Sequence, residues 1–208
     1  MTHNFPGSAA YWQQRYFKGG NSGAGSYGNL AKFKASIINQ FIKTNNICSV
    51  IEWGCGDGNQ LSLAKYNSYV GVDVSPEAIK LCEKKFENDN SKKFYVSGEV
   101  SILPEGNYDL SLSLDVIFHL IEDVKFENYM TNLFSSSNKF VIIYSSNNDK
   151  LLDPAVHVRH RKFTNWINKN AKSWSLKKKI KNKYPWNPNS KELTSFSDFY
   201  IYQKLESQ

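Results

Sequence analysis

The chain of 208 residues is 40% hydrophobic, carries 26 basic and 19 acidic residues, and has only three cysteines. It is long enough to bury a core, and no apolar run approaches the ~18 residues that a membrane span needs. The cysteines, Cys48, Cys55 and Cys82, have neither disulfide nor metal-ligand spacing, and the N-terminus lacks a secretion signal. We therefore expect a cytoplasmic protein with no metal site and no membrane span.

The net charge of +7 comes from one segment. Residues 159–183 contain ten basic residues and no acidic one, so 26 less ten leaves 16 basic residues against 19 acidic ones elsewhere. Such a run is either a solvated strand face or a surface that holds an anionic partner. Nucleic acid is therefore a second-choice partner, behind a small acceptor molecule.

Two contrasting segments open the chain. Residues 8–18 place aromatic residues at helical intervals after Ser8, which is a plausible N-cap. Residues 19–28 then contain five glycines in ten positions. This pattern predicts either a lid that closes over a bound molecule or a plain flexible connector, and we favour the lid. Its one aromatic residue, Tyr27, becomes a candidate substrate contact.

A predicted amphipathic helix follows at residues 29–44. An apolar run at 47–51 then ends in Glu52 and enters a turn with glycines at alternate positions, and a second apolar run at 69–72 ends in Asp73. This order predicts a β-α-β unit in a parallel sheet, with acids at the carboxyl ends of both strands. Glycine at these positions lets the backbone turn sharply and pass close to a ligand.

Residues 52–58 (EWGCGDG) and 71–75 (GVDVS) resemble the cofactor-binding half of the class I S-adenosylmethionine-dependent methyltransferases. A dinucleotide site uses G-x-G-x-x-G and faces a pyrophosphate, which acids beside the glycines would repel. A cationic sulfonium cofactor suits those acids. The resemblance implies S-adenosylmethionine as the cofactor, with contacts from Glu52, Gly54, Cys55, Gly56, Gly58, Asp73, Val74, Glu99 and Asp115.

The same alternation continues to residue 145. A helix is predicted from Ser75 and Pro76 to residue 86, and strands are predicted at 92–96, 108–114 and 138–145. In the family that this chain resembles, an acid after the third strand holds the adenine, which gives Glu99 its role. Residues 114–120 (LDVIFHL) resemble the family's segment that lines the methyl-transfer site.

The last third contains a cluster of histidines and arginines at 157–161 (HVRHR), a helix around 163–167, and β-like runs at 174–184 and 196–204. These runs resemble the antiparallel hairpin that completes the family's sheet. The resemblance implies an α/β, Rossmann-like, doubly wound sheet of seven mostly parallel strands. Residues 1–208 then form one domain: N-terminal helices and lid (1–45), cofactor-binding core (46–145), and substrate segment with terminal hairpin (146–208).

The acceptor is the least defined part of the prediction. If it is a hydroxyl, a base must take its proton, and His119 is the first candidate, with a rate that follows an ionisation near the ordinary histidine value of about 6.5. The other candidates are Asp115, His157 and His160, with Arg159 and Arg161 holding an anionic group. The glycine-rich loop and the HVRHR segment resemble methyltransferases that accompany glycan-building enzymes, which favours O-methylation of a small or sugar hydroxyl. An RNA or protein methyltransferase is the alternative, and a binding module without turnover is the third hypothesis.

Overall fold

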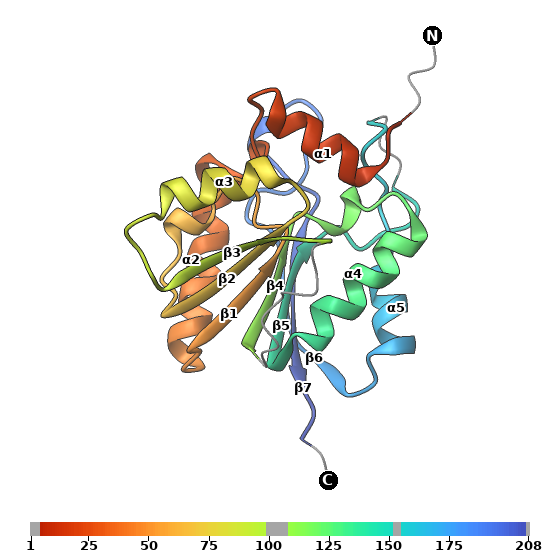
Figure 1. The fold of residues 1–208 in the computed structure, drawn as a ribbon. Helices are drawn as coiled ribbons and strands as arrows, with labels where there is room; N and C mark the ends of the chain where they lie inside the picture. The colour runs from red at the N-terminus through yellow and green to blue at the C-terminus, as the bar shows by residue number, and fades with distance from the viewer. Residues whose placement is uncertain (1–4, 99–107, 152–154, 207–208) are drawn as a thin grey trace.

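The computed structural model describes residues 5–98, 108–151 and 155–206. Seven strands form one sheet in the order β3-β2-β1-β4-β5-β7-β6 (Figure 1). The strands are β1 (Ser49–Trp53), β2 (Ser68–Asp73), β3 (Lys92–Val96), β4 (Tyr108–Leu114), β5 (Ser137–Ser145), β6 (Trp174–Ile180) and β7 (Asp198–Lys204). The helices are α1 (Ser8–Phe17), α2 (Gly28–Thr44), α3 (Pro76–Lys85), α4 (Asp123–Ser135) and α5 (Phe163–Asn170).

The pairing confirms the predicted fold class. Strands β1 to β5 pair in parallel, while β7 is antiparallel to both β5 and β6. The central strand β4 is buried along its whole length, as expected for a strand covered on both faces. The hairpin expected at the C-terminus is present, and its second strand lies between β5 and β6.

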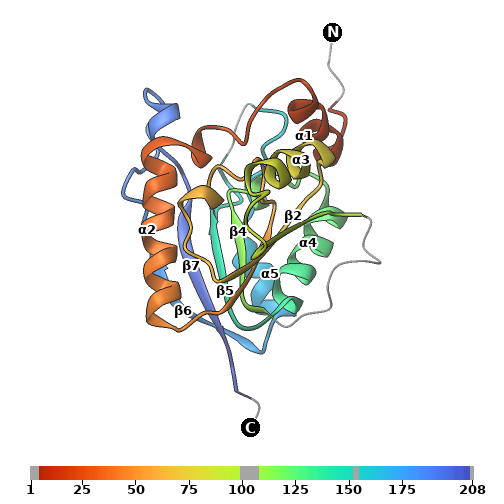
Figure 2. The same cartoon turned by 60° about the vertical axis from the view of Figure 1, so that its left-hand side comes forward.

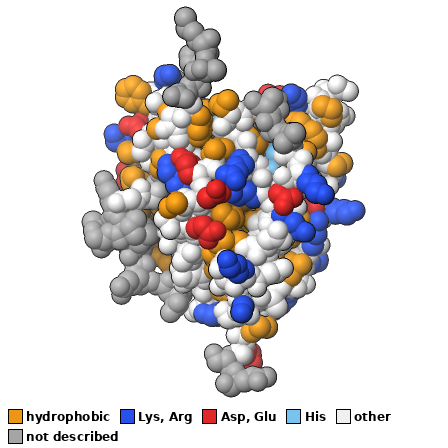
Figure 3. Space-filling view, turned by 90° about the vertical axis from the view of Figure 1, so that its right-hand side faces the viewer, with side chains coloured by type: hydrophobic (Ala, Val, Ile, Leu, Met, Phe, Trp, Pro, Cys, Tyr) orange, Lys and Arg blue, Asp and Glu red, His pale blue; other side chains and the backbone are white. Residues whose placement is uncertain are grey.

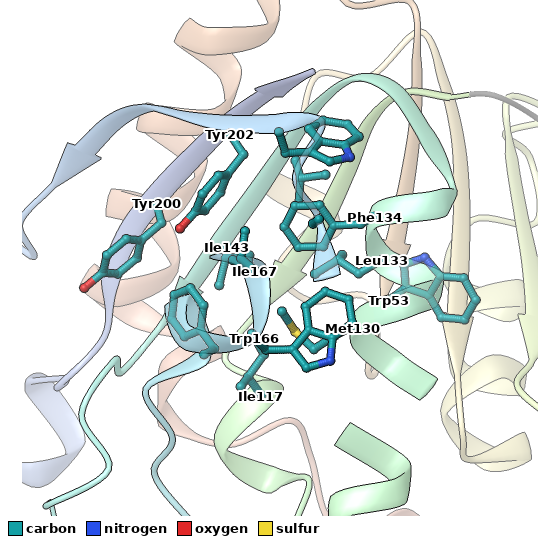
Figure 4. Close-up of a cluster of buried hydrophobic side chains, with 14 of the residues drawn as sticks. Trp53, Ile117, Met130, Leu133, Phe134, Ile143, Trp166, Ile167, Tyr200 and Tyr202 are labelled. Carbon is teal, nitrogen blue, oxygen red and sulfur yellow. The ribbon is translucent and has the colours of Figure 1, made fainter. Parts of the chain in front are cut away.

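Helices cover both faces of the sheet (Figures 1 and 2). Side chains from α2 and α3 pack with one face around Leu110 and Ile142, and those from α4 and α5 pack with the other around Met130 and Ile143. Figure 4 shows part of this second core, where Trp166 and Phe134 meet the sheet. Helix α1 lies across the carboxyl ends of the central strands, so the edge of the sheet that carries Glu52 and Asp73 is covered (Figure 1).

Three local predictions are wrong. The connection from β1 to β2 contains only a 3₁₀ turn, η2 (Leu61–Leu63), instead of a crossover helix. The glycine turn occupies the first five positions after β1, and too few residues remain for a stable helix. Ser8 is the first residue of α1 and not its cap, because its hydroxyl bonds Glu122 instead. The apolar residues of the helix predicted up to residue 86 include Leu81, which that pattern predicts to be buried, but Leu81 is 44% exposed.

Candidate active site

The glycine turn after β1 has the conformation that its sequence predicts. Gly54, Gly56 and Gly58 have φ angles of 82°, 59° and 70°, a region that favours glycine. A Cβ on Gly56 would lie 2.3 Å from Ser22 Oγ, and one on Gly58 would lie 3.0 Å from the Cys82 sulfur. Gly56 therefore lets the turn approach the glycine-rich loop, and Gly58 lets it pack on α3.

A cavity of about 420 Å³ opens beside this turn, over the carboxyl ends of β1, β2 and β4. Its volume lies within the range of small-molecule sites. Trp12 and Tyr16 of α1 cover it, and Ser22 and Ser26 of the glycine-rich loop close one side. The site residues predicted from the sequence that line it are Glu52, Gly54, Cys55, Gly56, Asp73, Val74, Asp115 and His119. Glu99 lies outside the described residues.

Two buried acids line the cavity. Asp73 accepts hydrogen bonds from the backbone N–H groups of Gly56 (2.9 Å) and Ser75 (3.0 Å), and burial raises its pKa. Glu52 accepts a hydrogen bond from the Tyr69 hydroxyl at 2.8 Å, and burial raises its pKa to about 7. These carboxyls are held rigidly in a wall that suits a cationic ligand with ribose hydroxyls. The residues therefore fit S-adenosylmethionine.

We predict that Asp73 binds the ribose hydroxyls of that cofactor. Replacing Asp73 with alanine should weaken cofactor binding by about 1.5 to 3 kcal/mol, the range for charge-assisted hydrogen bonds. Asp109 is a matched control, because it also accepts backbone hydrogen bonds, from Cys48 (2.7 Å) and Ser49 (3.2 Å), but does not line the cavity. Calorimetry should show a loss in Asp73→Ala only. Equal losses in both variants would mean a structural effect.

The glycine-rich loop is docked on the glycine turn through Asp57. The Asp57 carboxylate accepts hydrogen bonds from Ser22 N (3.0 Å) and from the Tyr27 hydroxyl (2.8 Å). Burial alone would raise the pKa of Asp57, but hydrogen bonds from Ser22, Asn59 and Tyr27 hold it below its usual value. Tyr27 thus points to the turn, and the residues lining the cavity do not include it. The loop is positioned as a lid would be.

The second prediction concerns this lid. Replacing Asp57 with alanine removes the acceptor of both loop contacts, so hydrogen exchange of residues 19–28 should become about 10-fold faster. Bound cofactor and acceptor should slow it in the wild-type protein. Asp89, which accepts hydrogen bonds within the loop before β3, is the control for a general effect of removing a loop acid. Exchange that is unchanged by Asp57→Ala and by ligands would argue for a plain connector.

His119 enters the cavity from the 3₁₀ turn η4 (Ile117–His119) after β4. Its Nδ1 lies 3.0 Å from the carbonyl oxygen of His157. A carbonyl oxygen can only accept, so Nδ1 carries the proton and Nε2 keeps a lone pair. Burial lowers the pKa of His119 to about 4, so the imidazole is neutral near pH 7 and not poised near 6.5 as expected.

The other members of the HVRHR segment lie elsewhere. His157 stacks between His119 (5.4 Å between ring centroids) and Tyr11 (4.4 Å), and does not line the cavity. His160 is buried, with its Nδ1 2.6 Å from the Ser146 hydroxyl. Together with both arginines it lines a second hollow, of about 440 Å³, beside α4 and α5. The geometry therefore brings only His119 and Asp115 of the proposed catalytic residues to the cavity.

Arg159 and Arg161 bind the start of α4. Arg159 donates to the carbonyl of Ile121 at 2.8 Å, and Arg161 donates to Asp123 at 2.6 Å. Arg161 also donates to the backbone of Leu120 at 3.2 Å. These contacts occupy much of the guanidinium donor capacity and fix the segment after β5 against the segment after β4.

The sequence did not reveal Lys34, in the second turn of α2, as a residue of this cavity. Its side chain is fully buried, lines the cavity, and forms an ion pair with Asp115 at 2.7 Å. Asp115 also accepts a hydrogen bond from the Ser197 hydroxyl at 2.8 Å and has a φ of 59°, which is rare for a residue other than glycine. Unusual backbone geometry of this kind clusters at functional sites.

The described ranges contain no group of three or more His, Cys, Asp and Glu side chains placed to hold a metal ion. Among the helices in the described part of the chain, none is both long and apolar enough to cross a membrane.

A seven-stranded sheet with this strand order, and a glycine turn and two acids beside a cavity, form the arrangement of an S-adenosylmethionine-dependent methyltransferase. The family model described as a methyltransferase domain matches residues 44–196, and the chain belongs to that family. No curated protein matches the sequence.

Solved structures share the fold at low identity. The N-methyltransferase NodS from Bradyrhizobium japonicum WM9, in complex with S-adenosyl-l-homocysteine, has a TM-score of 0.73 at 12% identity, covering 96% of this chain and 100% of that chain. Magnesium protoporphyrin IX methyltransferase from Synechocystis PCC 6803 with bound SAM has a TM-score of 0.66 at 15% identity, covering 98% and 100%. The methyltransferase domain of bacterial CtHen1-C has a TM-score of 0.65 at 18% identity, covering 86% and 100%. The enzyme class and its cofactor, S-adenosylmethionine, follow from the family and from these neighbours.

Proposed function

We propose that this enzyme methylates an oxygen atom of a small molecule or sugar, with His119 as the base that takes the hydroxyl proton. The bound cofactor supplies an electrophilic methyl group, and the chain itself must bind the acceptor and hold its proton. Trp12, Tyr16 and the glycine-rich loop exclude water from the cavity by covering it. Of the cofactor contacts proposed from the sequence and described in the structure, all but Gly58 line the same cavity.

The state of His119 is the observation that carries this proposal. The hydrogen bond to the His157 carbonyl fixes the tautomer and leaves Nε2 as the atom that can accept a proton. Burial lowers the pKa of His119, which keeps the imidazole unprotonated near pH 7 and also makes it a weaker base than a histidine of ordinary pKa. Trp12 packs edge-on against the imidazole at 4.9 Å, and stacking on His157 holds the other side. A hydroxyl acceptor must lose its proton as its oxygen attacks the methyl group, and Nε2 of His119 is placed to accept that proton.

The distribution of charge favours a small acceptor over a polyanion. The described residues that line the cavity include two cations, Lys34 and Lys125, and each is paired with an acid. Three of the ten basic residues of segment 159–183 lie on β6, the edge strand farthest from β2 and β3, where Lys179 pairs with Asp198 at 3.1 Å. Lysines on an edge strand deter pairing with other chains. Acidic and basic side chains also alternate on the face shown in Figure 3.

An RNA acceptor is the second candidate. One structural neighbour is described as the small RNA methyltransferase HEN1, at 18% identity and a TM-score of 0.62, although this chain covers only 26% of that protein. The feature that would serve RNA here is the second hollow, where Lys162 and Lys169 join Arg159. This hollow is separate from the cavity that holds His119.

The test is a screen for release of S-adenosylhomocysteine with sugars, nucleotide sugars, small phenols and short RNAs as acceptors. The proposal expects turnover with a hydroxyl compound and little dependence of its binding on salt. Turnover only with RNA, with affinity that falls steeply as salt rises, would replace it by the second candidate. Methylation at nitrogen of a small acceptor would refute the role of the base, and cofactor binding without turnover on any acceptor would favour a binding module.

A further inference from the structure

The segment 155–161, which follows β5, is bonded to the turn that carries His119. The carbonyl of His157 accepts a hydrogen bond from His119 Nδ1 at 3.0 Å, and Arg159 donates its backbone N–H to the carbonyl of Phe118 at 2.7 Å. The two arginine side chains of the segment bind carbonyls that follow His119 in the chain. Segment 155–161 therefore fixes the backbone on both sides of His119.

The imidazole of His157 adds a contact between rings. It stacks on the ring of His119, with 5.4 Å between the centroids and 12° between the planes, and on the ring of Tyr11 at 4.4 Å and 9°. Trp12, the next residue of α1, packs edge-on against His119 at 4.9 Å. Three nearly parallel rings thus connect His119 to α1, the helix that lies across the cavity (Figure 1).

These rings supply what the hydrogen bond at Nδ1 leaves open. That bond holds one atom of the His119 ring, and rotation about it would still move Nε2 away from an acceptor. Proton transfer depends on the direction of the lone pair, so a base needs a ring that cannot rotate. The ring of His157 on one face and the edge of Trp12 oppose this rotation. They also exclude water, and burial is the largest cause of the lowered pKa of His119.

We propose that His157 is a positioning residue for the base, and that it aligns His119 by joining it to Tyr11 of α1. The base is then held in place only while α1 covers the cavity, which couples closure of the site to its chemistry. This inference rests on the proposed function, in which His119 takes the hydroxyl proton. It gives the HVRHR segment a part in catalysis although His157 does not line the cavity.

The test is a titration of the histidine C2–H signals by NMR, with no acceptor present. The chain has four histidines, so each signal is assigned by replacement. His157→Ala opens one face of the His119 ring to water and removes a neighbouring imidazole. Both changes should raise the pKa of His119 from about 4 toward its ordinary value of about 6.5. His157→Phe keeps a flat ring on that face, so in this variant the pKa should stay well below 6.5.

His160→Ala is the matched control, because it removes an imidazole of the same segment whose ring packs on Phe118 at 5.9 Å. It should leave the titration of His119 unchanged. A His119 titration that His157→Ala does not move would overturn the proposal, and so would an equal rise in His160→Ala. Should His157→Ala unfold, Tyr11→Ala tests the stack from α1 and should move the titration in the same direction.

The kinetic test uses the acceptor that the screen for S-adenosylhomocysteine release identifies. His157→Ala should lower kcat by about 10- to 100-fold, the effect of a misplaced reacting group, and His157→Phe should restore most of it. Equal losses in both variants would overturn the proposal, because the flat ring would then not be what positions the base. Full activity in His119→Ala would refute the proposed function itself, and this result is distinguishable because the titrations need no acceptor.

Discussion

Replacing His119 with alanine is expected to lower kcat by about 10²- to 10⁴-fold on the true acceptor, the range for loss of a general base. Cofactor affinity should change little, because the proposed cofactor contacts in the described residues lie on the glycine turn and at Asp73, Val74 and Asp115. The variant loses the Nε2 lone pair of His119, and the groups packed on that ring are the carbonyl of His157 and the ring of Trp12. Stopped-flow or steady-state kinetics at saturating cofactor would measure the loss.

His160→Ala is the control, because that imidazole is also buried but lines the second hollow. It should retain kcat within about 10-fold if it folds. The pH profile gives a further check. The basic form of His119 exists above its pKa of about 4 and is lost as the pH falls through that value, so this group should leave kcat flat from pH 6 to 8. Full activity in His119→Ala would refute the assignment, and a single ionisation near 6.5 would move the role to a less buried histidine.

The sequence predicts the parts of the site that are formed by residues close together in the chain. Three alternate glycines beside acids predict a sharp turn that passes close to other groups. The structure agrees, because the φ angles of all three and the close approach of Ser22 to Gly56 favour glycine. Strand β4 and the helix start at Ser75 and Pro76 are also predicted, because the alternation of leucine and serine and a hydroxyl before proline are visible in a few residues.

The parts that the sequence misses depend on contacts between distant segments. Lys34 lies among the polar positions of an amphipathic pattern, yet α2 is buried on the side of Ala31, Lys34 and Ile38. Its partner Asp115 is 81 residues away, so no spacing rule connects them. The HVRHR segment shows the converse. Its charge density predicts a substrate cradle, which stays a prediction, and the structure adds that Arg159 and Arg161 donate to the carbonyls of Ile121 and Leu120 just before α4.

Among the ion pairs of the described residues, we expect the loss of Lys34–Asp115 to lower the free energy of unfolding most. We expect Asp115→Asn to lower the free energy of unfolding by about 3 to 5 kcal/mol, because it leaves a fully buried ammonium without its counter-ion. Asparagine keeps the size of the side chain and tolerates the φ of 59°, so backbone strain contributes little. Urea unfolding followed by circular dichroism measures the loss, provided that the denaturant slope is unchanged.

The double variant Lys34→Met/Asp115→Asn separates loss of a partner from loss of packing. Removing both charges of a buried pair is often near neutral, so the double variant should recover most of the stability that the single variant loses. If Asp115→Asn lowers the free energy of unfolding by less than about 1 kcal/mol, water or another group must reach Lys34. The buried ion pair would then contribute no more to stability than an exposed one. A double variant less stable than the single one would place the loss in side-chain packing, because charge could no longer account for it.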